Sequence, residues 1–199
     1  MNKMKYILNS LASNKIDILI VLTFILIGIF TRTVLHIIPN LEFVTALSIT
    51  AGVIVKNKKL AFIVPLFTML FTDLLIGNTI IFIFTWSGFI VPVLIGVLLK
   101  KADKSLSYVK LGVLGSLGGL ISTLIFFLWT NFGVVLTTSM YSKDLSGLIA
   151  SYINAIPFVR PQLIGNLILV PLVLLSAKFL FSENRLVVNS KLIHMIEKF

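Results

Sequence analysis

The chain has 199 residues, of which 58% are hydrophobic and only 12% are charged, and its mean hydropathy is +1.08. This composition excludes an ordinary soluble domain and predicts an all-α, polytopic membrane protein. The absence of cysteine rules out disulfides and cysteine-ligated metals. The formal net charge of +10 first points to a polyanionic partner, so the positions of the charges matter more than their sum.

Six apolar segments, bounded by charged or turn residues, are predicted to be transmembrane helices: 16–38, 41–55, 60–76, 79–99, 111–137 and 163–181. They divide the chain into a cytoplasmic segment over 1–15, a six-helix transmembrane domain over 16–181 and a cytoplasmic tail over 182–199. The first segment follows several lysines but has no small-residue cleavage site, so it is interpreted as a span and not as a signal peptide.

The second segment, 41–55, is too short for a bilayer about 30 Å thick, since 15 residues of helix cover about 22 Å. Short membrane segments often mark a binding site, because their ends face a cavity and not lipid. Local thinning of the bilayer is an equally good interpretation.

Lysine and arginine positions predict the orientation of the chain, because short cytoplasmic loops carry an excess of these residues. With the N-terminus inside, 14 of the 17 fall on the cytoplasmic side, and both termini are cytoplasmic. This distribution accounts for the net charge without any nucleic-acid partner. Only three basic residues are then expected on the outer side, and they are Arg32, Lys143 and Arg160.

Between the last two spans, residues 145–156 carry apolar side chains at helical spacing. Asp144 can cap the start of this segment, and Pro157 and Pro161 are expected to end it. The pattern predicts a short amphipathic helix along the outer membrane surface, either as an interfacial anchor or as a lid over a pocket.

Charged side chains within a span need a partner or a function, because each costs about 3 kcal/mol at the centre of the bilayer. Arg32 lies roughly 9 Å inside the outer end of the first span, and His36 follows one turn later. Asp73 lies at a similar depth in the third span. Arg32 and Asp73 are therefore predicted partners, either as a closed ion pair that joins two helices or as groups that face a solute.

Trp86 and Trp129 lie about 10 to 12 Å inside the outer ends of their spans, too deep for an aromatic belt at the interface. A buried indole needs an acceptor for its N–H, and its face suits a flat heterocycle. Asn131 is another polar group deep in a span, while Gln162 and Asn166 begin the last one. The candidate solute-binding residues are Arg32, His36, Asn40, Asp73, Trp86, Trp129, Asn131, Tyr141, Tyr152 and Asn166.

Polar groups on the outer side alone favour a blind, outward-open pocket over a channel, which needs polar lining at both ends. The sequence holds no enzyme signature, no cluster of metal ligands and no ATP-binding motif, so neither catalysis nor a cofactor is predicted. The pair Gly115 and Gly119 forms a GxxxG pattern, which favours close helix packing over the docking of a partner.

The sequence resembles the substrate-binding S components of energy-coupling factor (ECF) transporters, and most closely an uncharacterised S-component-like membrane family. The likeness covers roughly residues 20–175. These residues carry it: Arg32, Pro39-Asn40-Leu41-Glu42-Phe43, Ala51-Gly52, Pro65, Thr72-Asp73-Leu74-Leu75-Ile76-Gly77, Trp129-Thr130-Asn131-Phe132-Gly133, Tyr141, Leu145-Ser146-Gly147-Leu148 and Ala155-Ile156-Pro157-Phe158.

The resemblance implies a six-span binder of a vitamin, cofactor precursor or related micronutrient in a prokaryotic cell membrane. Its partners would be a transmembrane scaffold subunit and two cytoplasmic ATPases. The first span lacks the alanine-x-x-x-alanine docking motif of many such proteins and offers only Gly28 among small residues. A stand-alone binder or carrier is therefore an alternative. A further alternative is a non-transporting scaffold, similar to membrane subunits of the cell-shape machinery.

Overall fold

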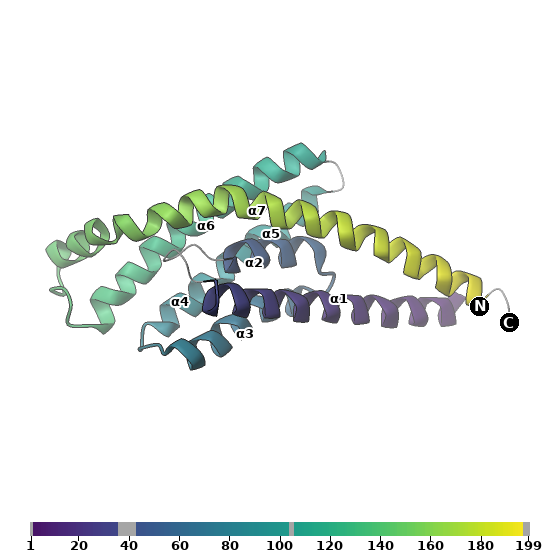
Figure 1. The fold of residues 1–199 in the computed structure, drawn as a ribbon, viewed down its shortest axis with the longest axis horizontal. Helices are drawn as coiled ribbons and strands as arrows, with labels where there is room; N and C mark the ends of the chain where they lie inside the picture. Colours follow the sequence, from purple (N-terminus) through teal and green to yellow (C-terminus); the bar gives the residue numbers. More distant parts are fainter. Residues whose placement is uncertain (1, 36–42, 104–105, 197–199) are drawn as a thin grey trace.

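The computed structural model describes the backbone of residues 2–35, 43–103 and 106–196, and the side chains of residues 14–35, 43–102 and 106–181. Within these ranges the chain forms helices only: α1 (Asn2–Thr33), α2 (Val44–Ile54), α3 (Lys58–Ile76), α4 (Phe82–Gly88), α5 (Ile90–Asp103), α6 (Tyr108–Thr137) and α7 (Leu145–Ile196). Figure 1 shows an elongated bundle in which the start of α1 and the end of α7 lie at the same end.

Five apolar stretches of helix are long enough to cross a membrane: Asn14–Thr33, Lys58–Ile76, Phe82–Ala102, Tyr108–Thr137 and Leu145–Phe181. The chain is therefore a multi-pass, all-helical membrane protein, as its composition predicts. The sixth predicted span corresponds to α2, whose 11 residues cover only about 17 Å. The predicted span over 79–99 consists of two helices, because α4 ends at Gly88 and α5 begins at Ile90.

The short helix α2 lies in the centre of the bundle, where ten of its 11 residues are buried. It packs mainly against α5 and α7. Gly52 of α2 and Gly96 of α5 allow this approach: a Cβ on Gly96 would lie 2.1 Å from the backbone oxygen of Ile49, and one on Gly52 would lie 2.5 Å from that of Val93. Because protein encloses α2, its ends do not need to reach the lipid surface.

The glycines of α6 allow its close packing against α7. A Cβ on Gly115 would lie 2.9 Å from a methyl group of Leu174, and one on Gly119 would lie 2.8 Å from Val170. The GxxxG pair is thus used for packing inside the chain, as the sequence favours. Gly28 of α1 is used in the same way, since its Cβ would meet Thr68 of α3 at 2.8 Å.

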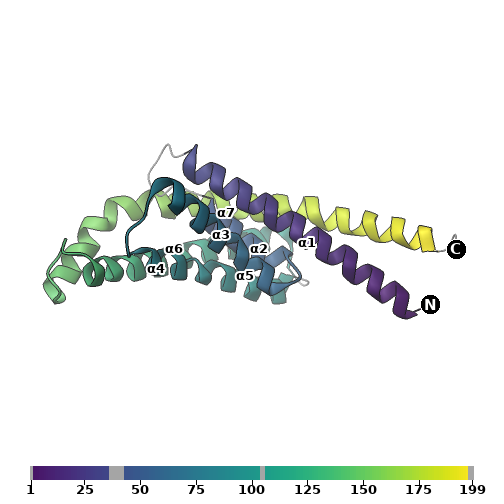
Figure 2. The same cartoon turned by 90° about the horizontal axis from the view of Figure 1, so that it is seen from below.

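The predicted separate surface helix over 145–156 is wrong in one respect, because α7 continues through Pro157, Pro161 and Pro171 to Ile196. A proline within a helix removes one hydrogen bond and bends the helix, but tertiary packing can hold the two parts together. Figure 2 shows the light-green first part of α7 bent relative to the rest.

Asp144 caps the start of α7, as predicted. Its Oδ1 atom accepts hydrogen bonds from the backbone N–H of Gly147 and the hydroxyls of Ser146 and Ser142, each at 2.8 Å. These hydrogen bonds lower the pKa of Asp144 from 3.8 to about 2, and the bond from the Gly147 N–H has the largest effect.

The substitution Asp144→Ala should lower the melting temperature of the protein by a few degrees, because the first turn of α7 loses its cap. A depressed pKa contributes stability that is full above 3.8 and is lost as the pH falls toward about 2. The difference in melting temperature between the wild type and Asp144→Ala should therefore disappear as the pH falls through that range. Thermal unfolding in detergent over a pH series measures this difference. Asp144→Asn keeps an acceptor oxygen but not the charge, so at neutral pH its melting temperature should lie between those of the wild type and Asp144→Ala. An equal difference at every pH would contradict this account.

The turn between α2 and α3 is held by side chains from α1 and α5. Asp17 of α1 is completely buried and accepts the backbone N–H groups of Lys56 and Asn57, both at 2.9 Å. Lys100 of α5 donates through Nζ to the carbonyl oxygen of Val55. We call this end of the bundle, formed by the α2–α3 turn and the last turns of α5, the lysine end.

Candidate functional site

A pocket of about 360 Å³ lies toward the end of the bundle opposite the lysine end. Its lining combines one cation, two amides and two hydroxyls with aromatic and aliphatic side chains, a mixture typical of small-molecule sites. The helices α1, α3, α4, α6 and α7 all contribute to it. The lining residues are Arg32, Met69, Ile76, Thr85, Phe126, Phe127, Thr130, Asn131, Ala155, Phe158, Val159 and Gln162.

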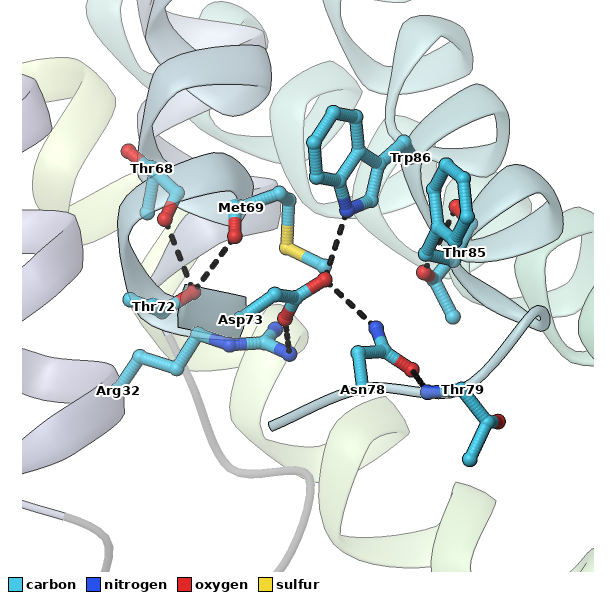
Figure 3. Close-up of polar contacts among 10 residues, drawn as sticks. Arg32, Thr68, Met69, Thr72, Asp73, Asn78, Thr79, Thr85 and Trp86 are labelled. Carbon is cyan, nitrogen blue, oxygen red and sulfur yellow. Dashed lines mark hydrogen bonds and ion pairs between the residues drawn. The ribbon is translucent and has the colours of Figure 1, made fainter. Parts of the chain in front are cut away.

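Arg32 and Asp73 form the ion pair that the sequence predicts. The Nη2 atom of Arg32 lies 3.3 Å from Oδ1 of Asp73, and the two side chains are only 18% and 8% exposed. The pair joins the ends of α1 and α3 at the edge of the pocket (Figure 3). Each charge compensates the other at a depth where an isolated charge would be costly.

The Asp73 carboxylate also accepts two further hydrogen bonds, both at Oδ2. The indole N–H of Trp86 donates at 2.7 Å, and the side-chain amide of Asn78 donates at 2.6 Å. Figure 3 shows these donors converging on Asp73 from α4 and from the loop after α3. Gly77, whose φ of 84° suits glycine, turns the chain between Asp73 and Asn78. The side chain of Asp73 thus connects α3 to α1, to α4 and to the loop after α3, beside the pocket.

Asn131 of α6 lines the pocket with an amide that is only partly satisfied. One of its N–H groups donates to the carbonyl oxygen of Phe127 at 2.8 Å, and its Oδ1 is 3.4 Å from the donating hydroxyl of Ser151. An amide has two N–H groups, so one remains for a ligand. The hydroxyl of Thr130 donates to Phe126 and keeps its own lone pairs as acceptors.

Gln162 of α7 contributes the second amide of the lining. Its side chain is only 7% exposed. Among the residues that the structure describes, none forms a hydrogen bond with this amide. Its nitrogen and oxygen are not among the buried, unpaired atoms of the described residues, so they are accessible from the pocket and can pair with water or a solute.

Trp129 lies outside the lining. It is 41% exposed, and its N–H donates to the hydroxyl of Ser87 at 2.8 Å. Its ring packs against Phe84 and Phe132, with centroids 5.0 and 6.1 Å away. In this structure Trp129 therefore holds α4 against α6.

Three other candidate residues also make contacts within the bundle instead of lining the pocket. The hydroxyl of Tyr152 donates to the carbonyl of Leu128 at 3.2 Å. The hydroxyl of Tyr141 accepts from Asn154 at 3.3 Å. Asn166 is 1% exposed, and its amide donates to Thr123 at 2.8 Å.

Residues 12–189 match the model of a family of unknown function, DUF6580. The chain belongs to the DUF6580 family. No curated protein and no solved structure matches it significantly. The match includes every residue of the pocket lining described above.

Of the ten candidate residues predicted for this DUF6580 member, Arg32 and Asn131 line the pocket, and Asp73 and Trp86 adjoin it. His36 and Asn40 lie outside the described residues. Within the described ranges there is no group of three or more His, Cys, Asp or Glu side chains that could hold a metal ion.

Sequence reasoning on this DUF6580 chain did not select Gln162 or Asn78 as candidates. One signal could have found Gln162. It follows Ala155, Phe158 and Val159 at helical spacing, which puts all four residues on one face of α7. Asn78 lies in a loop, and no periodic pattern relates a loop residue to Asp73.

Proposed function

We propose that the chain is a solute-binding membrane subunit that captures a small vitamin, cofactor precursor or related micronutrient. The observation that carries this proposal is the pocket beside Arg32 and Asp73, because it gathers charged, amide and aromatic groups in otherwise apolar helices. Polar groups in membrane helices are costly, so their concentration at one place indicates a ligand.

The position of the pocket supports capture from one side of the membrane. It lies opposite the lysine end, which the positive-inside rule assigns to the cytoplasm. In this orientation the pocket belongs to the outer half of the bilayer, and both termini are cytoplasmic. The chain would then cross the membrane six times, with α2 as a short central crossing enclosed by α5 and α7.

The sequence resemblance extends this proposal to an ECF-type importer in a prokaryotic cell membrane. The chain carries no ATP-binding motif, so energy for uptake would come from two cytoplasmic ATPases through a transmembrane scaffold subunit. The single small residue of the first span, Gly28, already packs against Thr68. Docking on a scaffold would therefore use another surface of the bundle.

Thermal unfolding of the purified protein with a panel of vitamins and nucleobases tests solute binding. A solute present at 100 times its Kd should stabilise the protein by about 2.7 kcal/mol. The shift should disappear in Asn131→Ala, which truncates an amide of the lining. It should persist in Asn154→Ala, a matched truncation of an exposed amide outside the pocket. The proposal fails if no solute shifts the melting temperature, or if Asn131→Ala and Asn154→Ala respond alike.

A non-transporting scaffold is the second candidate. It is favoured by one observation, namely that Arg32 and Asp73 already compensate each other without a solute. This alternative predicts a stable membrane partner that co-purifies with the chain, together with no response to any solute. Co-purification of the scaffold subunit and ATPases, together with a solute-dependent shift, would favour the transporter instead.

A further inference from the structure

We propose that the pocket recognises an uncharged, flat heterocycle that carries a lactam edge, with a carbonyl beside a ring N–H, and that Gln162 pairs with this edge. This inference rests on the proposed function, since it assumes that the pocket binds a solute. It adds the chemical class of that solute and the residue that selects it.

The state of Gln162 is the first argument. Its amide lines the pocket, is 7% exposed and forms no hydrogen bond within the described part of the chain. The amide atoms are accessible from the pocket, so a ligand there can pair with them without displacing any hydrogen bond within the described residues. The side chain presents a carbonyl and an N–H2 group next to each other, and a lactam presents the complementary pair. A ligand of this kind would satisfy both groups at once.

Asn166 provides a comparison on the same helix. It lies one turn after Gln162 and is even more deeply buried, at 1% exposed. Its amide donates to Thr123 of α6 at 2.8 Å, and it does not line the pocket. The fold thus supplies a partner to the amide that lies below the pocket, whereas the amide that reaches the pocket has none among the described residues.

The charge balance is the second argument, because it indicates an uncharged solute. Among the described lining residues, Arg32 alone carries a charge, and the Asp73 carboxylate lies 3.3 Å from it. An anionic solute would have to compete with Asp73 for the guanidinium. A neutral solute leaves this pair intact.

The shape of the lining is the third argument. Phe126, Phe127 and Phe158 supply aromatic surface, which stacks favourably on flat rings. Thr130 and Asn131 add an acceptor and an N–H donor beside them. A volume of about 360 Å³ is near the lower limit for small-molecule sites, which suits a compound of two fused rings.

Calorimetric titration with three related probes tests the solute class. Lumazine carries neutral lactam edges, 1,3-dimethyllumazine has lost the N–H groups of those edges, and lumazine-6-carboxylate adds a negative charge. We expect lumazine to bind at least about tenfold more tightly than either derivative, since a site built for a hydrogen bond rejects ligands that cannot form it. Hypoxanthine and 1-methylhypoxanthine provide a second pair with the same contrast.

The substitution Gln162→Leu tests the residue, because leucine is apolar and carries no amide. It should weaken lumazine binding at least about tenfold and leave the 1,3-dimethyl derivative unaffected. Without solute, the variant should be about as stable as the wild type, because the amide that is removed makes no hydrogen bond with the described residues. A purely structural glutamine would show the opposite, a fall in melting temperature with no change in selectivity. Asn166→Leu, which leaves Thr123 without its amide donor, is the control expected to lower stability.

The inference is overturned if lumazine-6-carboxylate or the methylated probes bind as tightly as the lactams, or if Gln162→Leu retains lumazine affinity. If charged vitamins bind and the lactams do not, the inference fails while the proposed function stands. If no compound binds at all, both fail.

Discussion

Replacing Asp73 by alanine should destabilise the protein by about 3 to 5 kcal/mol, the largest effect we expect from any single polar substitution in the bundle. The change removes the carboxylate from a guanidinium that is only 18% exposed. It also takes the shared acceptor from Trp86 and Asn78. Unfolding by titration with sodium dodecyl sulfate in mixed micelles measures the change in free energy.

Two further variants separate the charge from the hydrogen bonds of Asp73. Asp73→Asn keeps an oxygen acceptor for Trp86 or Asn78, so its loss should be smaller than that of Asp73→Ala. Combining Asp73→Leu with Arg32→Leu removes both charges, and the double variant should recover much of the stability. A loss below about 1 kcal/mol in Asp73→Ala would show that the ion pair does not hold α1 to α3.

Replacing Gly96 by alanine should cost about 3 kcal/mol and lower the yield of folded protein, because the new methyl group has no space. Its Cβ would lie 2.1 Å from the backbone oxygen of Ile49 and 3.0 Å from Cα of Gly52. Backbone atoms of the buried helix α2 cannot move aside as a flexible side chain can. The yield and the free energy of unfolding in detergent are the measurements.

Gly112→Ala is the matched control for Gly96→Ala. A Cβ at Gly112 would lie 3.2 Å from the terminal methyl of Leu175, a flexible group that can give way. Its effect should stay within about 1 kcal/mol. Equal losses in the two variants would contradict the close crossing of α2 and α5.

The partnership of Arg32 and Asp73 could be predicted from their positions in the sequence. Each helical residue advances about 1.5 Å along the axis, so position along a span gives depth directly. Arg32 and Asp73 were predicted as partners on this basis, and they lie 3.3 Å apart. The same reasoning predicted acceptors for both indoles, and Trp86 and Trp129 donate to Asp73 and Ser87.

The direction in which each side chain points could not be predicted in the same way. In lipid, both the interior and the lipid-facing sides of a helix are apolar, so periodicity does not identify the buried face. Trp86 therefore lies beside the pocket while Trp129, at a similar predicted depth, is 41% exposed. Likewise, only the structure distinguishes Gln162 from Asn166. Asn166 donates to Thr123 of α6, whereas Gln162 has no hydrogen-bond partner among the described residues.

The prolines in the first part of α7 show a different limit of prediction from sequence. Pro157 and Pro161 are expected to stop a helix because each removes a hydrogen bond and crowds the preceding turn. In the bundle, α7 continues through them and bends, held along much of its length by contacts with α6. The local sequence correctly predicted that the prolines disrupt the regular helix. Packing against α6 determines that the helix bends there and does not end.

The sequence by itself determined that this chain is helical, that it lies in a membrane and that Arg32 and Asp73 occupy similar positions along their spans. Those properties depend on composition and on distance along a helix. Only the tertiary structure decided which of the polar groups share a pocket, because that depends on how each helix is rotated against its neighbours. Arg32 and Asn131 line one pocket with Gln162, whereas Trp129 and Asn166 hold helices together.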